Sequence, residues 1–317
     1  MMQEPTIVFV TANFAKGRDL FDYLKKFGNR YDEDFVYWEN VAFTVNASIS
    51  AKSLLVLNQP DAVIERQLNK ANILALMMEP GDPKWHPWMF QKLEQYGQVF
   101  SPLKESPNGR LSHGFLGWGI DYNNQEMNQL SIPEKKHIIS CIASDLKQLE
   151  GHRFRIGFVE KLQKEMPQID FYGRGRKFLP DKMDGLLPYR YSIAIENDSK
   201  PYYFTEKIND CFLAYTVPVY FGCKNIGQFF PAQSFVQIDI HQPDAALLEI
   251  RKLIEKNDWE ERLDAVKEAR RLVLDKYHPL AGAADYFNEV PLATETERIQ
   301  IKPVRVKRLH RLLQKFQ

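Results

Sequence analysis

Short apolar runs alternate with polar, helix-like stretches along the first third of the chain. The run TIVFV at 6–10 is followed by a turn and then by apolar residues at helical spacing, namely Leu20, Phe21, Leu24 and Phe27. Three further runs, at 35–38, 53–57 and 73–78, have the character of strands, and the polar segment 61–70 is typical of a helix. Alternation of this kind predicts a parallel sheet with helices on its faces.

The pattern is interrupted and then begins again. Residues 79–135 are rich in Pro, Gly, Trp and Asn, so we expect functional loops and a connection between domains there. The alternation then resumes, with predicted strands at 137–144, 168–172, 190–195, 216–221 and 235–239 and predicted helices at 151–165 and 205–214. The stretch 244–276 predicts one long helix, with Asp244 placed to cap its start.

Chain length and this restart together predict two Rossmann-like α/β domains, since 317 residues suffice for two cores of ordinary size. We expect an N-terminal domain over 1–135, a second domain over 136–290 and a basic amphipathic tail over 291–317. Lys and Arg number 42 against 41 Asp and Glu, so composition gives no reason to expect a nucleic-acid partner.

The number and spacing of the cysteines and the pattern of the N-terminal residues indicate the cellular compartment. Cys141, Cys211 and Cys223 are odd in number and spaced for neither a disulfide framework nor a zinc site, which favours buried thiols in a reducing environment. The apolar run near the N-terminus is too short for a signal peptide or a membrane span. We therefore expect a cytoplasmic protein.

The stretch 190–231 carries the most informative chemistry. It predicts a strand, a polar loop, a helix and a second strand, and loops at the carboxyl ends of parallel strands are where open α/β sheets bind ligands. Thr205 is placed to cap the helix, so the N–H groups of its first turn and the Lys207 ammonium form a candidate site for a pyrophosphate. Glu206 is a candidate acceptor for ribose or sugar hydroxyls.

These residues resemble glycosyltransferase family 10, the α1,3/α1,4-fucosyltransferases. The family pattern Y-K-F-x-L-x-F-E-N, Y-V-T-E-K and P-V-x-x-G appears here as YRYSIAIEN, YFTEK and TVPVYFG, in the same order and with similar spacing. The segments FYGRGR at 171–176 and GHRFRIGFVEKL at 151–162 also resemble the family. The resemblance covers about 137–290 and implies a GT-B fold, with two Rossmann-like domains facing across a cleft.

Residue roles follow from the resemblance position by position. It implies that Glu206 and Lys207 contact the ribose and phosphate of the donor, that Arg155 binds its pyrophosphate, and that Asn197 and Tyr203 are further donor contacts. Two cationic groups on the departing GDP would supply what a metal supplies elsewhere. The sequence has no clear Asp-x-Asp motif, so we expect neither a metal nor any other cofactor.

The resemblance also implies a general base. In the family a Glu follows an N-terminal-domain strand in a segment of the form Y-T-G-E-N-x-x-P, and ILALMMEPGDPKW places Glu79 there with Pro83 in register. Pro80 and Gly81 depart from the polar residues of that pattern. Alternative interpretations stay open at this point: Glu79 as a strand-end carboxylate in a salt bridge, and Glu206 and Lys207 as ordinary first-turn helix residues.

The function that the resemblance implies is inverting transfer of fucose from GDP-fucose to a glycan, with α1,3 linkage to a bacterial surface glycan as its particular form. The alternatives are another nucleotide-sugar donor on the same fold, or a catalytically silent carbohydrate-binding scaffold. The tail presents Leu309, Leu312, Leu313 and Phe316 at helical spacing among basic residues. Two interpretations remain for it: peripheral contact with the inner face of an anionic membrane, or packing on the protein itself.

Overall fold

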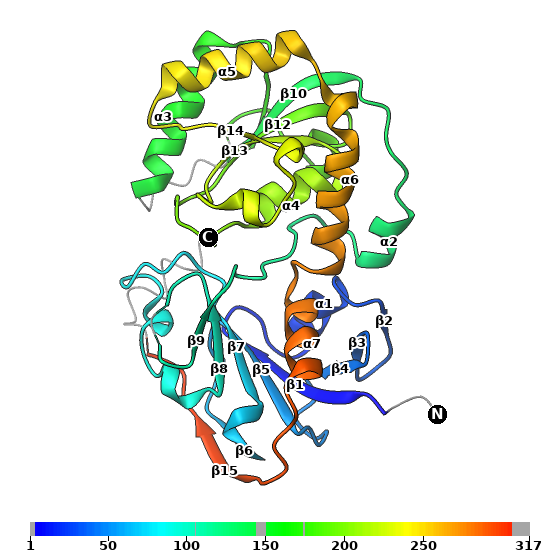
Figure 1. The fold of residues 1–317 in the computed structure, drawn as a ribbon, viewed down its shortest axis with the longest axis vertical. Coiled ribbons are helices and arrows are strands. Elements are labelled where there is room, and N and C mark those ends of the chain that lie inside the picture. Colours follow the sequence, from blue (N-terminus) through cyan, green and yellow to red (C-terminus); the bar gives the residue numbers. More distant parts are fainter. Residues whose placement is uncertain (1–3, 105, 144–149, 174, 306–317) are drawn as a thin grey trace. The chain divides into compact units, whose positions relative to one another are not determined.

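The computed structural model describes residues 4–104, 106–143, 150–173 and 175–305. The chain divides into two compact units (Figure 1). The first comprises Met1–Leu116, Asp121–Asn128 and Lys276–Gln317, and the second comprises Gly117–Ile120 and Gln129–Asp275. The chain thus crosses between the units four times, and four residues after Leu116 belong to the second unit.

The first unit is built on an eight-stranded sheet with the order β2-β3-β4-β1-β5-β7-β8-β9. Its strands are β1 (Thr6–Ala12), β2 (Arg30–Tyr31), β3 (Val36–Trp38), β4 (Val41–Thr44), β5 (Ser53–Leu57), β7 (Ile73–Leu76), β8 (Gln98–Ser101) and β9 (Gly109–Leu111). The pairings from β4 to β9 are parallel, whereas β2, β3 and β4 pair antiparallel. Every residue of β5 and β7 is buried, which is typical of parallel strands covered on both faces. The helices of this unit are α1 (Gly17–Lys25), α2 (Asn124–Gln129) and α7 (Pro279–Glu289), with one residue of α2 assigned to the second unit.

A second, two-stranded sheet corrects two predictions. The polar segment predicted as a helix over 61–70 contains strand β6 (Ile64–Leu68), and the segment predicted as a tail over 291–317 contains strand β15 (Glu297–Ile301). The two strands pair antiparallel, with Ile64 opposite Ile301. The partner of β6 lies more than two hundred residues away in sequence, so no local pattern indicates it. The remainder of the predicted basic tail, residues 306–317, lies outside the described residues.

Four further predictions differ from the structure. The region 79–135, predicted as loops, contains the short strands β8 and β9 and helix α2. The long helix predicted over 244–276 is two helices, α5 (Pro243–Lys256) and α6 (Trp259–Asp275), because Asn257 adopts a left-handed conformation with φ of 51°. Asp244 is not the cap: the cap position is Gln242, and Asp244 lies in the first turn. Helix α7, whose residues lie within the range 136–290 predicted for the second domain, belongs to the first unit.

The second unit has a parallel five-stranded sheet with the order β11-β10-β12-β13-β14. Its strands are β10 (His137–Ile142), β11 (Asp170–Tyr172), β12 (Tyr189–Ile195), β13 (Val217–Phe221) and β14 (Val236–Gln237), and its helices include α3 (Glu150–Glu165) and α4 (Glu206–Leu213). One core cluster joins the three central strands to α3, α5 and two residues of α6, Trp259 and Val266, and α4 packs against α6 (Figure 1). The chain runs from β10 to β11 on one side and from β12 to β13 on the other, so the strand order reverses between β10 and β12. Open α/β sheets bind ligands at such a point.

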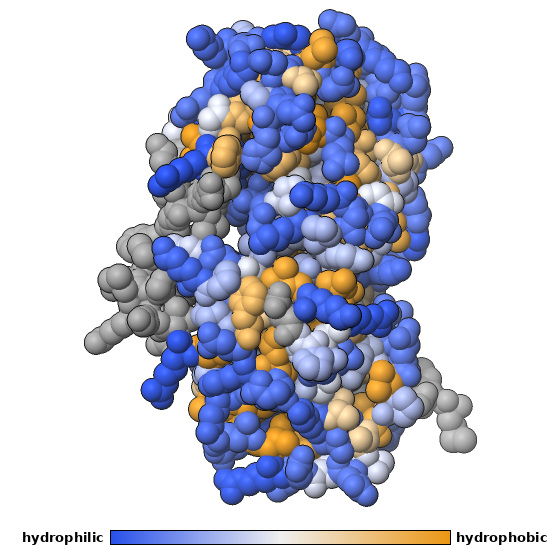
Figure 2. Space-filling view, turned by 60° about the vertical axis from the view of Figure 1, so that its left-hand side comes forward, coloured by the Kyte–Doolittle hydropathy of each residue, from blue (hydrophilic) through white to orange (hydrophobic). Residues whose placement is uncertain are grey.

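The surface is mainly hydrophilic on the face shown in Figure 2, with hydrophobic residues in separate patches. Across the described residues, none of the helices combines the length and the hydropathy that a membrane span requires. All three cysteines are buried free thiols, as the sequence indicated.

Candidate functional site

Arg155 and Asn197 meet where the strand order of the second sheet reverses. Arg155 comes from α3, which follows β10, and Asn197 comes from the loop that follows β12. The Arg155 guanidinium donates a hydrogen bond to the Asn197 side-chain oxygen, and the Arg155 side chain is buried, with 5% of the residue exposed. Burial lowers the pKa of Arg155, while Glu196 acts in the opposite direction. A buried cation thus lies at the position where the fold binds ligands.

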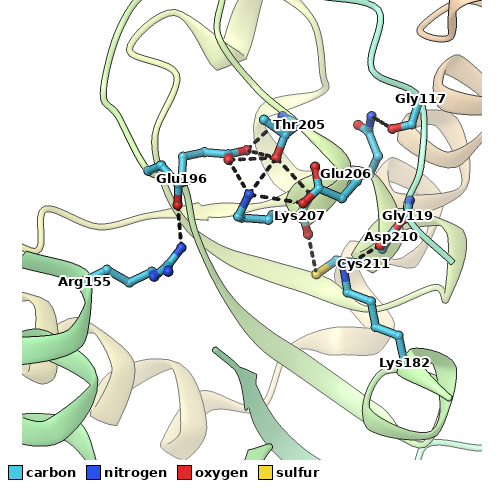
Figure 3. A network of polar contacts seen from close by, with 12 residues as sticks. Gly117, Gly119, Arg155, Lys182, Glu196, Thr205, Glu206, Lys207, Asp210 and Cys211 are labelled. Atoms are coloured by element: carbon cyan, nitrogen blue, oxygen red, sulfur yellow. Dashed lines mark hydrogen bonds and ion pairs between the residues drawn. The ribbon is translucent and has the colours of Figure 1, made fainter. Parts of the chain in front are cut away.

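Glu196 ties the end of β12 to the start of α4 (Figure 3). Its carboxylate accepts hydrogen bonds from the Thr205 N–H at 2.8 Å and from the Thr205 hydroxyl at 2.7 Å. Thr205 caps α4, as the sequence predicted, because its hydroxyl accepts from the Lys207 N–H. Burial raises the pKa of Glu196, whereas the neighbouring Lys207 lowers it. The contact fixes the direction in which the helix N-terminus points.

Lys207 and Glu206 form an ion pair at this N-terminus. The Lys207 ammonium lies 3.1 Å from Glu206 Oε1 and 3.3 Å from Glu196 Oε2, and it also donates to the Thr205 hydroxyl. Burial acts to raise the pKa of Glu206, but Lys207 and Lys182 together lower it to about 2. Glu206 therefore stays ionised near neutral pH, and a carboxylate that only accepts hydrogen bonds suits hydroxyl groups as partners.

A second ion pair also involves a residue of α4. The Lys182 ammonium lies 2.6 Å from Asp210 Oδ2, and Asp210 also accepts from the backbone N–H of Gly119. On the preceding residue, the Asn209 amide donates to the Gly117 carbonyl oxygen. The short segment 117–120 is thus held against α4 by two buried side chains. Sequence reasoning missed these contacts, because nothing local links residues so far apart along the chain.

Tyr203, also predicted as a donor contact, is buried, with 4% of the residue exposed. It directly precedes Phe204, whose ring packs against the rings of Phe229 and Phe230. The structure places Tyr203 in the loop between Asn197 and Thr205. Its role toward a donor stays a prediction.

Glu79 belongs to the first unit, whereas the other predicted site residues belong to the second. It follows β7 at the carboxyl edge of the sheet, after two buried methionines, and its side chain is 37% exposed. Glu79 Oε2 lies 3.5 Å from His86 Nε2. Under the salt-bridge interpretation, His86 is thus the partner of Glu79. The same geometry is compatible with Glu79 as a general base beside an imidazole.

The departure from the family pattern after Glu79 has a packing reason. Gly81 has a φ of +78°, a conformation that side-chain-bearing residues rarely adopt. A Cβ on Gly81 would lie 2.0 Å from Leu103 Cδ1, so the residue must also be small. The loop after Glu79 is therefore shaped by a close approach to Leu103. Across the described ranges, no group of three or more His, Cys, Asp and Glu side chains is arranged to hold a metal ion.

Comparison with known proteins first defines the class. The crystal structure of an α1,3-fucosyltransferase with GDP is similar over 88% of this chain and 96% of that one, with a TM-score of 0.52 and 17% identity. The apo structure of OtsA is similar over 90% of this chain and the whole of that one, with a TM-score of 0.51 and 9% identity. The fold is that of the GT-B glycosyltransferases, as predicted.

Sequence comparison matches part of the chain to a family. Residues 132–262 match the model of the C-terminal domain of glycosyltransferase family 10 (fucosyltransferase), so the predicted resemblance is confirmed. The human 4-galactosyl-N-acetylglucosaminide 3-alpha-L-fucosyltransferase FUT6 is 32% identical over 208 residues, which are 64% of this chain and 56% of that protein. The human 3-galactosyl-N-acetylglucosaminide 4-alpha-L-fucosyltransferase FUT3 is 28% identical over 147 residues, 44% of this chain and 40% of that protein. The chain thus spans less than two thirds of either relative.

Proposed function

We propose that the protein is a fucosyltransferase that uses GDP-fucose and transfers the sugar with inversion to a hydroxyl group of a glycan. The observation that carries the proposal is the hydrogen bond between Arg155 and Asn197 at the point where the strand order reverses, inside the part that matches the family-10 domain. The crystallised α1,3-fucosyltransferase of the same fold contains GDP, which supports the same nucleotide here. The α1,3 linkage and a bacterial surface glycan as acceptor are the finer part of this proposal.

The donor-binding part of the mechanism uses the second unit. Arg155 and the N-terminus of α4 bind the pyrophosphate, with Lys207 as the second cation, and Glu206 accepts hydrogen bonds from ribose or sugar hydroxyls. Asn197 and Tyr203 complete the donor contacts. Because Lys207 is paired with two carboxylates before donor binds, the pyrophosphate replaces part of that pairing rather than meeting a free ammonium.

The chemical step uses Glu79 as the general base. The acceptor oxygen attacks the anomeric carbon of fucose while the bond from that carbon to GDP breaks, and the hydroxyl proton passes to Glu79. The negative charge that develops on the departing GDP is stabilised by Arg155 and Lys207. A β-linked donor then gives an α-linked product. Electrostatic stabilisation by these two side chains is the reason why we propose a reaction without a metal.

The test has two parts. Isothermal titration calorimetry with GDP, GDP-fucose, GDP-mannose and UDP-galactose should show tight binding of GDP and GDP-fucose alone. Glu79→Gln should abolish transfer while leaving GDP affinity within a few-fold of wild type, because it removes a proton acceptor and little volume. Binding of a different nucleotide would reject the fucosyl assignment, and unchanged turnover in the variant would reject Glu79 as the base.

A further inference from the structure

The loop after Glu79 folds back on itself through Asp82. The Asp82 Oδ1 atom accepts hydrogen bonds from the backbone N–H groups of Lys84 and Trp85, at 2.7 and 3.3 Å. The backbone N–H of His86 donates to the Asp82 carbonyl oxygen at 2.7 Å. These local bonds define a single compact turn, and the turn brings His86 back beside the carboxylate seven positions earlier in the chain.

The turn also orients the imidazole of His86. His86 is buried, and its Nδ1 atom accepts a hydrogen bond from the backbone N–H of Asp82 at 3.3 Å. A neutral imidazole whose Nδ1 accepts carries its proton on Nε2. The Nε2 atom is the one that lies 3.5 Å from Glu79 Oε2, and the Trp88 ring packs edge-on against the imidazole with the centroids 5.4 Å apart. The protonated nitrogen therefore faces the carboxylate.

We propose that His86 is a positioning residue for Glu79, holding one carboxylate oxygen through its Nε2–H so that the other oxygen faces the acceptor hydroxyl. The inference rests on the proposed function, in which Glu79 is the general base. In the transfer step the acceptor proton moves to the other oxygen of Glu79, and His86 neither gains nor loses a proton. This is the arrangement in which a third group orients a base, as in hydrolase triads.

The charged side chains of the loop support this assignment. Asp82 directs its carboxylate to backbone N–H groups of the turn, and the Lys84 ammonium lies over the Trp85 ring, 5.0 Å from its centroid. Glu79 is the charged group of the loop that lies beside the imidazole nitrogen. A neutral donor beside a carboxylate stabilises its ionised form, so His86 should extend the activity of Glu79 to lower pH.

Three variants separate positioning from packing. His86→Leu removes the donor, His86→Gln keeps an N–H that can reach Glu79 but cannot be protonated, and Trp88→Phe changes the packing of the imidazole without removing its donor. Trp88 is a matched control because its buried indole N–H has no hydrogen-bond partner to lose. All three are measured on the full chain for kcat, KM for acceptor, Kd for GDP-fucose and the pH profile of kcat/KM.

We expect His86→Leu to lower kcat by roughly ten- to a hundredfold, part of the roughly 10²–10⁴-fold that a general base contributes, with donor Kd unchanged. The acid limb of its pH profile should move to higher pH, and His86→Gln should restore most of kcat and the wild-type limb. Trp88→Phe should resemble wild type. An unshifted profile and normal kcat in His86→Leu, with Glu79→Gln inactive, would overturn the role of His86 and leave the base assignment standing.

A measurement without turnover completes the test. Nitrogen-15 NMR of the imidazoles, with His86 assigned from His86→Gln, should show the proton of His86 on Nε2 in wild type. The Nε2 signal should move in Glu79→Gln, because its partner has lost its charge. A proton on Nδ1, or a signal identical in the two proteins, would overturn the inference. Active Glu79→Gln protein would instead reject the proposed base itself.

Discussion

The backbone N–H of Gly119 donates a hydrogen bond to the Asp210 carboxylate over 2.8 Å. A Cβ on Gly119 would lie 2.8 Å from Glu206 Cγ and 3.1 Å from Asp210 Oδ2. Gly119 is thus the position at which the short segment 117–120 touches the proposed donor site. Sequence reasoning did not consider Gly119, whereas it singled out Glu206, which a Cβ on Gly119 would meet.

Gly119→Ala should therefore displace Glu206 and weaken GDP-fucose binding by about tenfold, which corresponds to about 1.4 kcal/mol. Calorimetric titration of the purified variant measures the effect. Gly157→Ala is the matched control, because a Cβ there would meet nothing within 4 Å. It replaces a glycine inside a helix and should keep normal affinity. Equal affinities in the two variants would show that Glu206 is not set by this contact.

The Lys182–Asp210 pair should matter for stability. The Asp210 side chain is fully buried, so Lys182→Met leaves a carboxylate without its cation and should cost about 3–5 kcal/mol in the free energy of unfolding. Adding Asp210→Asn to that variant should recover part of the loss, because the buried group becomes neutral. Lys252→Ala, which breaks an exposed pair with Glu249, should cost at most about 1 kcal/mol. Urea denaturation of all four proteins measures these differences, and a loss in Lys182→Met no larger than that in Lys252→Ala would contradict the argument.

Lys207→Ala should weaken GDP binding by about 1–3 kcal/mol, the usual scale for a hydrogen bond to a charged group. The control is Lys267→Ala on α6, where the ammonium pairs with the exposed Asp264. Normal GDP affinity in Lys207→Ala would mean that the ammonium serves Glu196 and Glu206 alone. The same titrations at two salt concentrations should show a smaller salt dependence for the Lys207 variant, because a charge has been removed from the site.

Lys135 should make stability depend on pH. Its ammonium donates to the carbonyl oxygens of Leu187 and Ala214 and to the Thr216 hydroxyl, and burial lowers the pKa of Lys135 to about 7. Between about pH 7 and the ordinary pKa of 10.5, the unfolded chain binds the proton and the folded chain does not. This residue therefore adds stability as pH rises through that window, by up to about 1.4 kcal/mol per pH unit.

The measurement compares the free energy of unfolding of wild type and Lys135→Met between pH 6 and pH 10. The difference between them should change steadily across the window, in favour of wild type at higher pH. A constant difference would show that the three acceptors keep the ammonium charged in the folded protein.

The sequence by itself determined the class of fold and most of the residues that meet at the proposed donor site. The apolar runs of strands that are buried on both faces of a parallel sheet can be recognised in short stretches of sequence. The same holds for the capping residue Thr205 and for Glu206 and Lys207, which follow it. Arg155 and Asn197 were identified from family motifs, and the structure brings their side chains together. Each of these features is specified by residues that are close together in the sequence.

Only the tertiary structure decided the features that join distant segments. Strand β6 was predicted as a helix because its partner β15 is more than two hundred residues away. The Lys182–Asp210 pair, the contact of Gly119 with α4 and the burial of Lys135 likewise bring together residues from separate elements. The turn that places His86 beside Glu79 is formed by local hydrogen bonds, but the path of the loop also depends on the close approach of Gly81 to Leu103. Such contacts arise from the folding of the whole unit, and periodicity along the chain carries no signal for them.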